Sequence, residues 1–120
     1  MTAQQSARLI GLAGAALGAF LGMRPHRVSR EVSGGSSVGA NWLRLLGARH
    51  LGQGIALLGR PTSRVLSGSA AVDGLHAASM VMLALASPAY RRPAALSAAV
   101  ATASGTASGW TAGRLRREGR

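Results

Sequence analysis

The sequence has no cysteine and no lysine, only three acidic residues, and few aromatic side chains. Without cysteine the chain forms no disulfide bond and has no thiolate for redox chemistry or metal binding. Charged residues make up 14% of the chain, against about 25% in a typical soluble domain. These shortages, with 17 glycines, favour close helix packing in lipid over a soluble core.

All 14 basic residues are arginine, and the formal net charge is +11. In a soluble chain such a charge would suggest nucleic acid. Here the arginines gather between apolar segments and at the C-terminus, as they do where a membrane protein meets anionic headgroups. We therefore expect the lipid bilayer as the partner, and no nucleic acid.

Four apolar segments predict an all-α, single-domain, four-transmembrane-helix bundle. The first segment has about the minimum length for a span. A signal peptide is the alternative, which the single Arg8 and the lack of a small-residue cleavage site disfavour. The fourth segment is only weakly hydrophobic, but its Ser and Thr side chains can bond to their own helix backbone. The predicted spans are about 7–23, 41–59, 64–87 and 94–113.

The connections between these segments carry turn signals. Pro25 can begin a short interfacial helix in the first loop, and residues 33–37 (SGGSS) predict a flexible connector. The second segment ends at Gly-Arg-Pro, residues 59–61, and Ser63 is a candidate N-cap for the third. This tight turn predicts that the second and third helices are antiparallel neighbours.

Glycines recur every four residues in the first and fourth segments. Such a face lets a neighbouring helix backbone approach closely. The predicted helix-packing positions are Gly14, Gly18, Gly22, Gly105, Gly109 and Gly113.

Polar residues lie in the middle of the second and third segments. Arg49 and Gln53 share one face of the second helix, and Asp73 and His76 share one face of the third. Arg49 is eleven residues before Arg60, or about 16 Å along the helix axis. Asp73 is nine residues after Arg64, or about 14 Å. At this similar depth an Arg49–Asp73 ion pair is predicted, with His76 and Gln53 completing the hydrogen bonds, because a lone charge there costs about 3 kcal/mol or more.

The opposite helix faces are predicted to contact lipid. They carry Leu51, Ile55 and Leu58 on the second helix and Leu75, Met82 and Leu85 on the third. Seven arginines flank the side that holds both termini, against five on the other side. The positive-inside rule then predicts the inner (cytoplasmic) membrane, with both termini in the cytoplasm.

No catalytic residue, cofactor or metal site is predicted. The three histidines and Asp73 have no recognisable metal-ligand spacing, and the glycines lack the strand–helix context of a nucleotide loop. The favoured interpretation is a non-enzymatic assembly or partner-binding protein, a homo-oligomer or one bound to another membrane protein. Two alternatives stay open: a small transporter or proton-conducting subunit using Asp73, His76 and Arg49, and a membrane enzyme acting on a lipid or quinone.

The segments RLLGARHLGQGIALLGRP and SRVLSGSAAVDGLHAASMVML resemble a family of small bacterial four-helix membrane proteins with a domain of unknown function. The match rests on Arg44, Gly47, Arg49 and Asp73, while His50 stands where such sequences often have Glu. Some relatives join a similar membrane unit to a cyclase-like domain, and a more distant likeness is to DoxX-like proteins. The resemblance implies a multi-pass membrane protein and no activity.

Overall fold

The computed structural model describes residues 1–32 and 39–120, which are helical and contain no strand. The elements are α1 (Ala3–Met23), α2 (Pro25–Val32), α3 (Ala40–Gly59), α4 (Ser63–Ala86), the 3-10 turn η1 (Pro88–Tyr90) and α5 (Arg91–Glu118). The all-α class is confirmed for these residues. The predicted connector at 33–37 lies outside the described residues.

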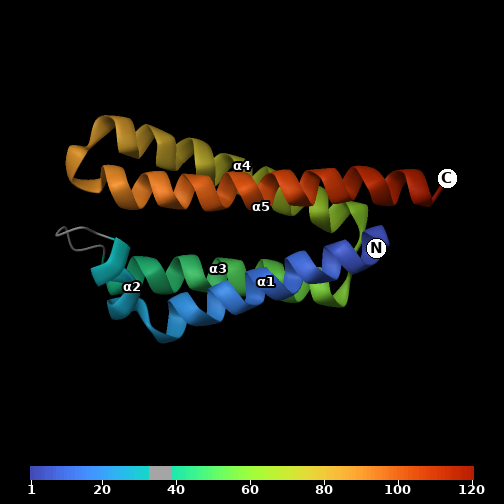
Figure 1. The fold of residues 1–120 in the computed structure, drawn as a ribbon, viewed down its shortest axis with the longest axis horizontal. Coiled ribbons are helices and arrows are strands. Elements are labelled where there is room, and N and C mark those ends of the chain that lie inside the picture. Colours follow the sequence, from blue (N-terminus) through green and yellow to red (C-terminus); the bar gives the residue numbers. More distant parts are fainter. Residues whose placement is uncertain (33–38) are drawn as a thin grey trace.

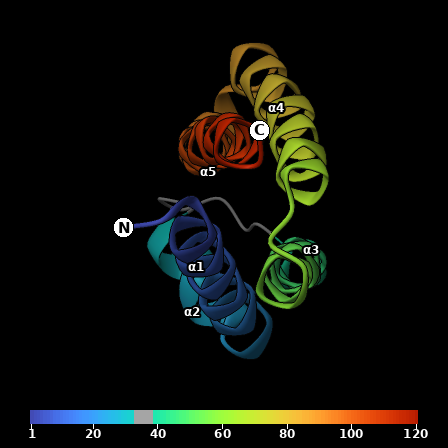
Figure 2. The same ribbon diagram turned by 90° about the vertical axis from the view of Figure 1, so that its right-hand side faces the viewer.

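The four long helices form two antiparallel pairs, α1 with α3 and α4 with α5 (Figure 1). Figure 2 views the two pairs from one end of the bundle, where α3 lies below α4 and α1 lies below α5. Contacts between the pairs are sparse. The helices α3 and α4 are antiparallel across a short turn, as expected, but the main packing partner of α3 is α1.

Glycines bring α1 and α3 into backbone contact. A Cβ atom added to Gly18 would lie 2.5 Å from the carbonyl oxygen of Gly47, and one added to Gly54 would lie 2.5 Å from that of Gly11. No side chain fits at such distances, so only glycine allows this approach. The contact pairs are therefore Gly11 with Gly54 and Gly18 with Gly47. On each helix the two contact glycines are seven residues apart.

The predicted glycine faces take part unevenly. Gly14 makes only ordinary contacts with α3, and a Cβ on Gly22 would meet nothing within 4 Å. On α5, a Cβ on Gly105 would lie 3.2 Å from the Cβ of Asp73, whereas Gly109 and Gly113 have no neighbour closer than 3.9 Å. Of the predicted glycines on α1, Gly18 lies in the close contact, whereas Gly11, its companion there, was not predicted. Two packed helices meet at alternating steps of three and four residues, so a strict four-residue spacing turns away from the interface.

The two ends of the bundle differ in packing. At the end that holds both termini, one apolar cluster joins all four long helices through Ala7, Leu57, Leu66 and Ala112. At the other end there are two separate clusters. One joins α1, α2 and α3 through Leu21, Val28 and Leu43, and the other joins α4 and α5 through Met80, Ala94 and Ala98. The helix pairs are thus closed together at one end and apart at the other.

Side-chain caps begin α1 and α4 at the end of the bundle that holds both termini. Thr2 and Gln5 form a capping box at the start of α1. The N-cap of α4 is Thr62, whose hydroxyl accepts a hydrogen bond from the Val65 amide at 3.3 Å. The predicted cap, Ser63, is instead the first helical residue, because it is Thr62 that has the extended backbone of a cap.

The large apolar side chains lie mainly outside the bundle, and the small and polar ones lie inside. Leu75 and Leu85 are each more than 70% exposed, while Asp73, Ser108 and Ala101 are at most 1% exposed. Other leucines, among them Leu57 and Leu66, are buried, so the leucines divide between the core and the outer surface.

Candidate functional site

A polar cluster lies between the two helix pairs. Arg49 of α3 forms an ion pair with Asp73 of α4. Gln53, one turn along α3, donates from Nε2 to the Ser69 hydroxyl at 3.0 Å and to Asp73 Oδ1 at 3.4 Å. The structure thus brings together three of the four residues predicted to form the cluster, and adds Ser69.

The fourth residue, His76, is placed differently from the prediction. Its Nε2 lies 2.8 Å from the hydroxyl of Ser97 on α5, and no hydrogen bond between His76 and Asp73 is present in the described chain. His76 is one turn beyond Asp73 on α4, where α5 is the packed neighbour. Its hydrogen bond therefore joins α4 to α5 rather than completing the ion pair.

The cluster leaves several buried polar atoms without a hydrogen bond among residues 1–32 and 39–120. They are Arg49 Nε and Nη1, Gln53 Oε1 and Asp73 Oδ2; Ser108 Oγ on α5, outside the cluster, is a fifth such atom. In a low dielectric each such group costs free energy rather than contributing it. The cluster therefore fixes how the helices align and contributes little net stability.

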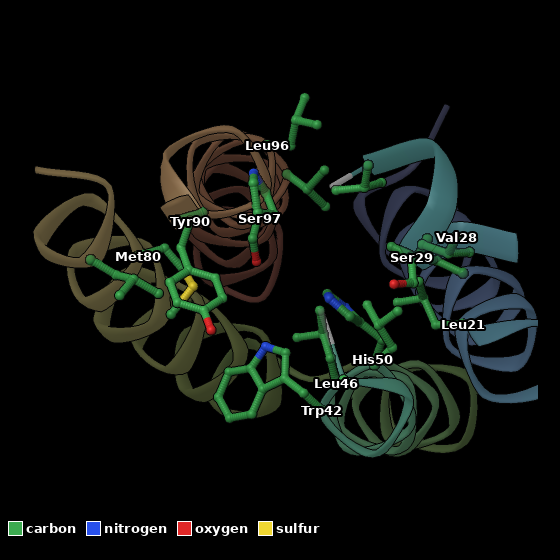
Figure 3. A pocket seen from close by; sticks show the side chains of 18 of the residues that line it. Leu21, Val28, Ser29, Trp42, Leu46, His50, Met80, Tyr90, Leu96 and Ser97 are labelled. Carbon is green, nitrogen blue, oxygen red and sulfur yellow. The ribbon is translucent and has the colours of Figure 1, made fainter. Parts of the chain in front are cut away.

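A pocket of about 580 Å³ lies between the helix pairs at the end away from the termini. Its walls are mostly apolar and come from α1, α2, α3, η1, α4 and α5 (Figure 3). His50 and Ser97 contribute polar atoms, and both point into the space between the helices in Figure 3. Trp42 and Tyr90 also line the pocket and are about half exposed.

His50 lines the pocket, although it was not among the predicted site residues. The buried residues of α3 are Leu43, Gly47, His50, Gly54 and Leu57, an alternation of four and three residues. That alternation marks the buried stripe of a packed helix, and it could have placed His50 inside. This buried stripe is the sequence signal for His50, and it lies next to the helix face that carries Arg49 and Gln53.

In the described part of the chain no group of three or more His, Asp or Glu side chains could hold a metal ion. Arg49, Asp73 and His76 do not line the pocket. The side chains with polar atoms that line the pocket are His50, Ser97, Ser29, Trp42 and Tyr90, and the remaining walls are apolar.

Two helices, α1 and α4, are long and apolar enough to cross a membrane by length and composition. Because α1 lies near the N-terminus, a signal sequence at that position would meet the same criterion. Of the four predicted spans, α1 and α4 meet this criterion, and α3 and α5 do not.

No protein-family model, curated protein or solved structure matches this chain. The resemblance to small bacterial four-helix membrane proteins stays a prediction from the sequence.

Proposed function

We propose that the chain is a four-span integral membrane protein with a non-enzymatic role, as an assembly or partner-binding unit. The observation that carries this proposal is the outward position of the large apolar side chains. A water-soluble monomer rarely exposes a continuous apolar surface of more than a few hundred Å². Here exposed leucine, isoleucine, valine and methionine side chains run along all four long helices.

The helices α3 and α5 support four spans despite their lower hydropathy. Their polar side chains, such as Arg49, Gln53 and Ser108, are buried or half-buried in the bundle. Their exposed faces carry Leu45, Leu51, Ile55 and Leu58 on α3 and Leu96, Val100 and Trp110 on α5. In lipid the outward face decides the cost of insertion, because inward polar groups are shielded by neighbouring helices.

The position of the arginines sets the proposed orientation. Both termini and the turn between α3 and α4 lie at one end of the molecule (Figure 1). Seven arginines belong to that end, and six belong to the other end when Arg44 at the start of α3 is included. The remaining arginine, Arg49, lies in the middle of α3 and is not counted for either end. The terminal end is proposed to face the cytoplasm from the inner membrane, by a margin of one arginine.

The structural role of the polar cluster supports a non-enzymatic function. The ion pair joins α3 to α4 where the helix pairs have few other contacts. A transporter or proton path would need its ionisable groups open to a passage. Arg49, Asp73 and His76 line neither the pocket that contains His50 nor the second pocket beside Trp110. The cluster is therefore assigned to the alignment of the helices.

Membrane extraction and purification test the proposal. The protein should resist extraction with alkaline carbonate and should dissolve in detergent. A phosphatase fused to Arg120 should be inactive, since it would remain in the cytoplasm, and a cytoplasmic reporter at the same site should be active. Co-purification from native membranes should recover another copy or another membrane protein. Release by carbonate as a soluble monomer would contradict the proposal.

A further inference from the structure

The pocket near η1 has a closed inner wall and an open rim. The wall is formed by buried residues that include Leu21, Leu43, Met80 and Ala94. The rim is formed by side chains that are more than 40% exposed, namely Phe20, Trp42, Tyr90 and Leu96. A volume of about 580 Å³ falls in the range of pockets that bind small organic ligands.

His50 is the feature that distinguishes this pocket from a simple apolar gap. The residue is only 6% exposed, and its ring points into the pocket (Figure 3). The described chain offers no hydrogen-bond partner to this ring. A neutral imidazole carries one N–H donor and one acceptor nitrogen, and neither ring nitrogen of His50 is among the fully buried atoms without a partner, so the ring is open to the pocket. The wall of the pocket thus presents a donor that an incoming molecule could satisfy.

Ser97 lies on the α5 side of the same space. Its hydroxyl is held 2.8 Å from His76 Nε2. A hydroxyl has one donor and two acceptor positions, so this contact leaves Ser97 able to make a second hydrogen bond into the pocket. His50 and Ser97 place two polar atoms, from opposite helix pairs, among apolar walls.

We propose that this pocket binds a neutral, single-chain lipid whose carbonyl oxygen accepts a hydrogen bond from His50. The acyl chain lies along the apolar walls and leaves through the rim at Phe20 and Leu96. The inference goes beyond the proposed function, and it requires neither four spans nor a particular orientation.

The walls favour a neutral polar end over a charged one. Arg49, the basic side chain adjacent in sequence to His50, is engaged by Asp73 and does not line the pocket. No arginine is among the lining residues. A carboxylate or phosphate seated beside His50 would be desolvated without a cationic partner, at a cost that a carbonyl group avoids. A carbonyl oxygen needs only the single donor that His50 supplies.

Quenching of tryptophan fluorescence tests the proposal on the purified full chain in detergent. The chain has two tryptophans, so Trp110→Phe leaves Trp42, a lining residue, as the reporter. The probe is a monoacylglycerol with a brominated acyl chain, compared with the brominated fatty acid and a brominated alkane of equal length. Trp42→Phe leaves Trp110, which lines the other pocket, and gives the level of quenching that arises without the His50 pocket.

The expected result is saturable quenching of Trp42 by the ester, above the level seen for Trp110. His50→Phe keeps the size of the side chain and should weaken ester binding about tenfold. His50→Gln, which retains an N–H donor, should restore much of the affinity. The matched control is His26→Phe on exposed α2, which should bind as the parent does.

Three outcomes overturn the proposal: equal binding of the alkane and the ester, tighter binding of the fatty acid, or unchanged affinity in His50→Phe. Where His50→Phe does not purify as a single species, the comparison of ester with alkane on the parent chain decides alone. A failure to bind leaves the membrane topology untouched, because that is measured separately by membrane extraction and fusions.

Discussion

Arg49 of α3 and Asp73 of α4 form an ion pair between two helix pairs that are also joined by the apolar cluster at the terminal end. The Asp73 side chain is 1% exposed and the Arg49 side chain 21%, so the pair lies at the inner edge of the α3–α4 contact. Several of its polar atoms have no hydrogen bond in the described chain. The pair therefore aligns the helices more than it stabilises them.

Removal of one partner is expected to be more harmful than removal of both. Asp73→Ala or Arg49→Ala leaves the other polar group without its partner, which costs about 3–5 kcal/mol in soluble proteins and less in membranes. The double variant Arg49→Leu with Asp73→Leu should match the parent or exceed it, because the parental cluster is only partly hydrogen-bonded. The measurement is the fraction of monodisperse protein in detergent after heating.

The charge swap, Arg49→Asp with Asp73→Arg, is the companion test. It should be more stable than either of its single halves. If the effects of the two alanine substitutions simply add in the double alanine variant, the side chains do not interact, and the alignment of α3 with α4 is wrong.

The glycine contact between α1 and α3 gives a second prediction. In Gly54→Ala the new Cβ would lie within 2.5 Å of the Gly11 carbonyl oxygen, so the helices must move apart, at a cost of about 1–3 kcal/mol. The control is Gly52→Ala on the same helix, where a Cβ meets nothing within 4 Å. That change should be neutral or stabilising, because alanine favours a helix over glycine by about 1 kcal/mol. Thermal stability in detergent separates the two, and equal effects would contradict the close approach.

The hydrogen bond between His76 and Ser97 gives a third prediction. Ser97→Ala should destabilise the α4–α5 pair by about 0.6 kcal/mol, the average for such bonds in a membrane protein. The matched control is Thr102→Ala, because the Thr102 hydroxyl bonds only to the Ala98 carbonyl on its own helix, at 2.8 Å. Unfolding in a denaturing detergent measures both. A larger loss for Thr102→Ala would show that Ser97 has no role between the helices.

The helices themselves could be predicted from local signals. Proline, glycine and arginine mark the ends of the apolar segments, and α3 (Ala40–Gly59) and α4 (Ser63–Ala86) begin and end within a residue or so of their predicted bounds. The fifth helix extends to Glu118 because Arg114 and Glu118 contact the start of α1: Arg114 Nη2 donates to the Met1 carbonyl at 3.1 Å. Such a contact depends on the tertiary fold, so the basic C-terminal sequence could not reveal it.

The candidate site was predictable only in part, for a similar reason. Arg49 and Asp73 face each other because they lie at a similar depth along neighbouring helices. That depth can be counted from the sequence. The pocket depends on how far the two helix pairs separate at the η1 end. That separation follows from packing of α2 on α1 and α3, through Val28, and of η1 beside α4 and α5. His50 acquires its place in the pocket from these contacts rather than from its own segment.

The four-span bundle is tested most directly by labelling single introduced cysteines in intact cells. The natural chain has no cysteine, so no residue has to be removed first. Cysteines are placed at Thr2, Thr62, Ala89 and Gly119, and probed with a membrane-impermeant reagent. Four spans with cytoplasmic termini predict labelling at Ala89 alone. If only α1 and α4 cross the membrane, position 62 would be labelled and position 89 protected, and that result would contradict the four-span bundle.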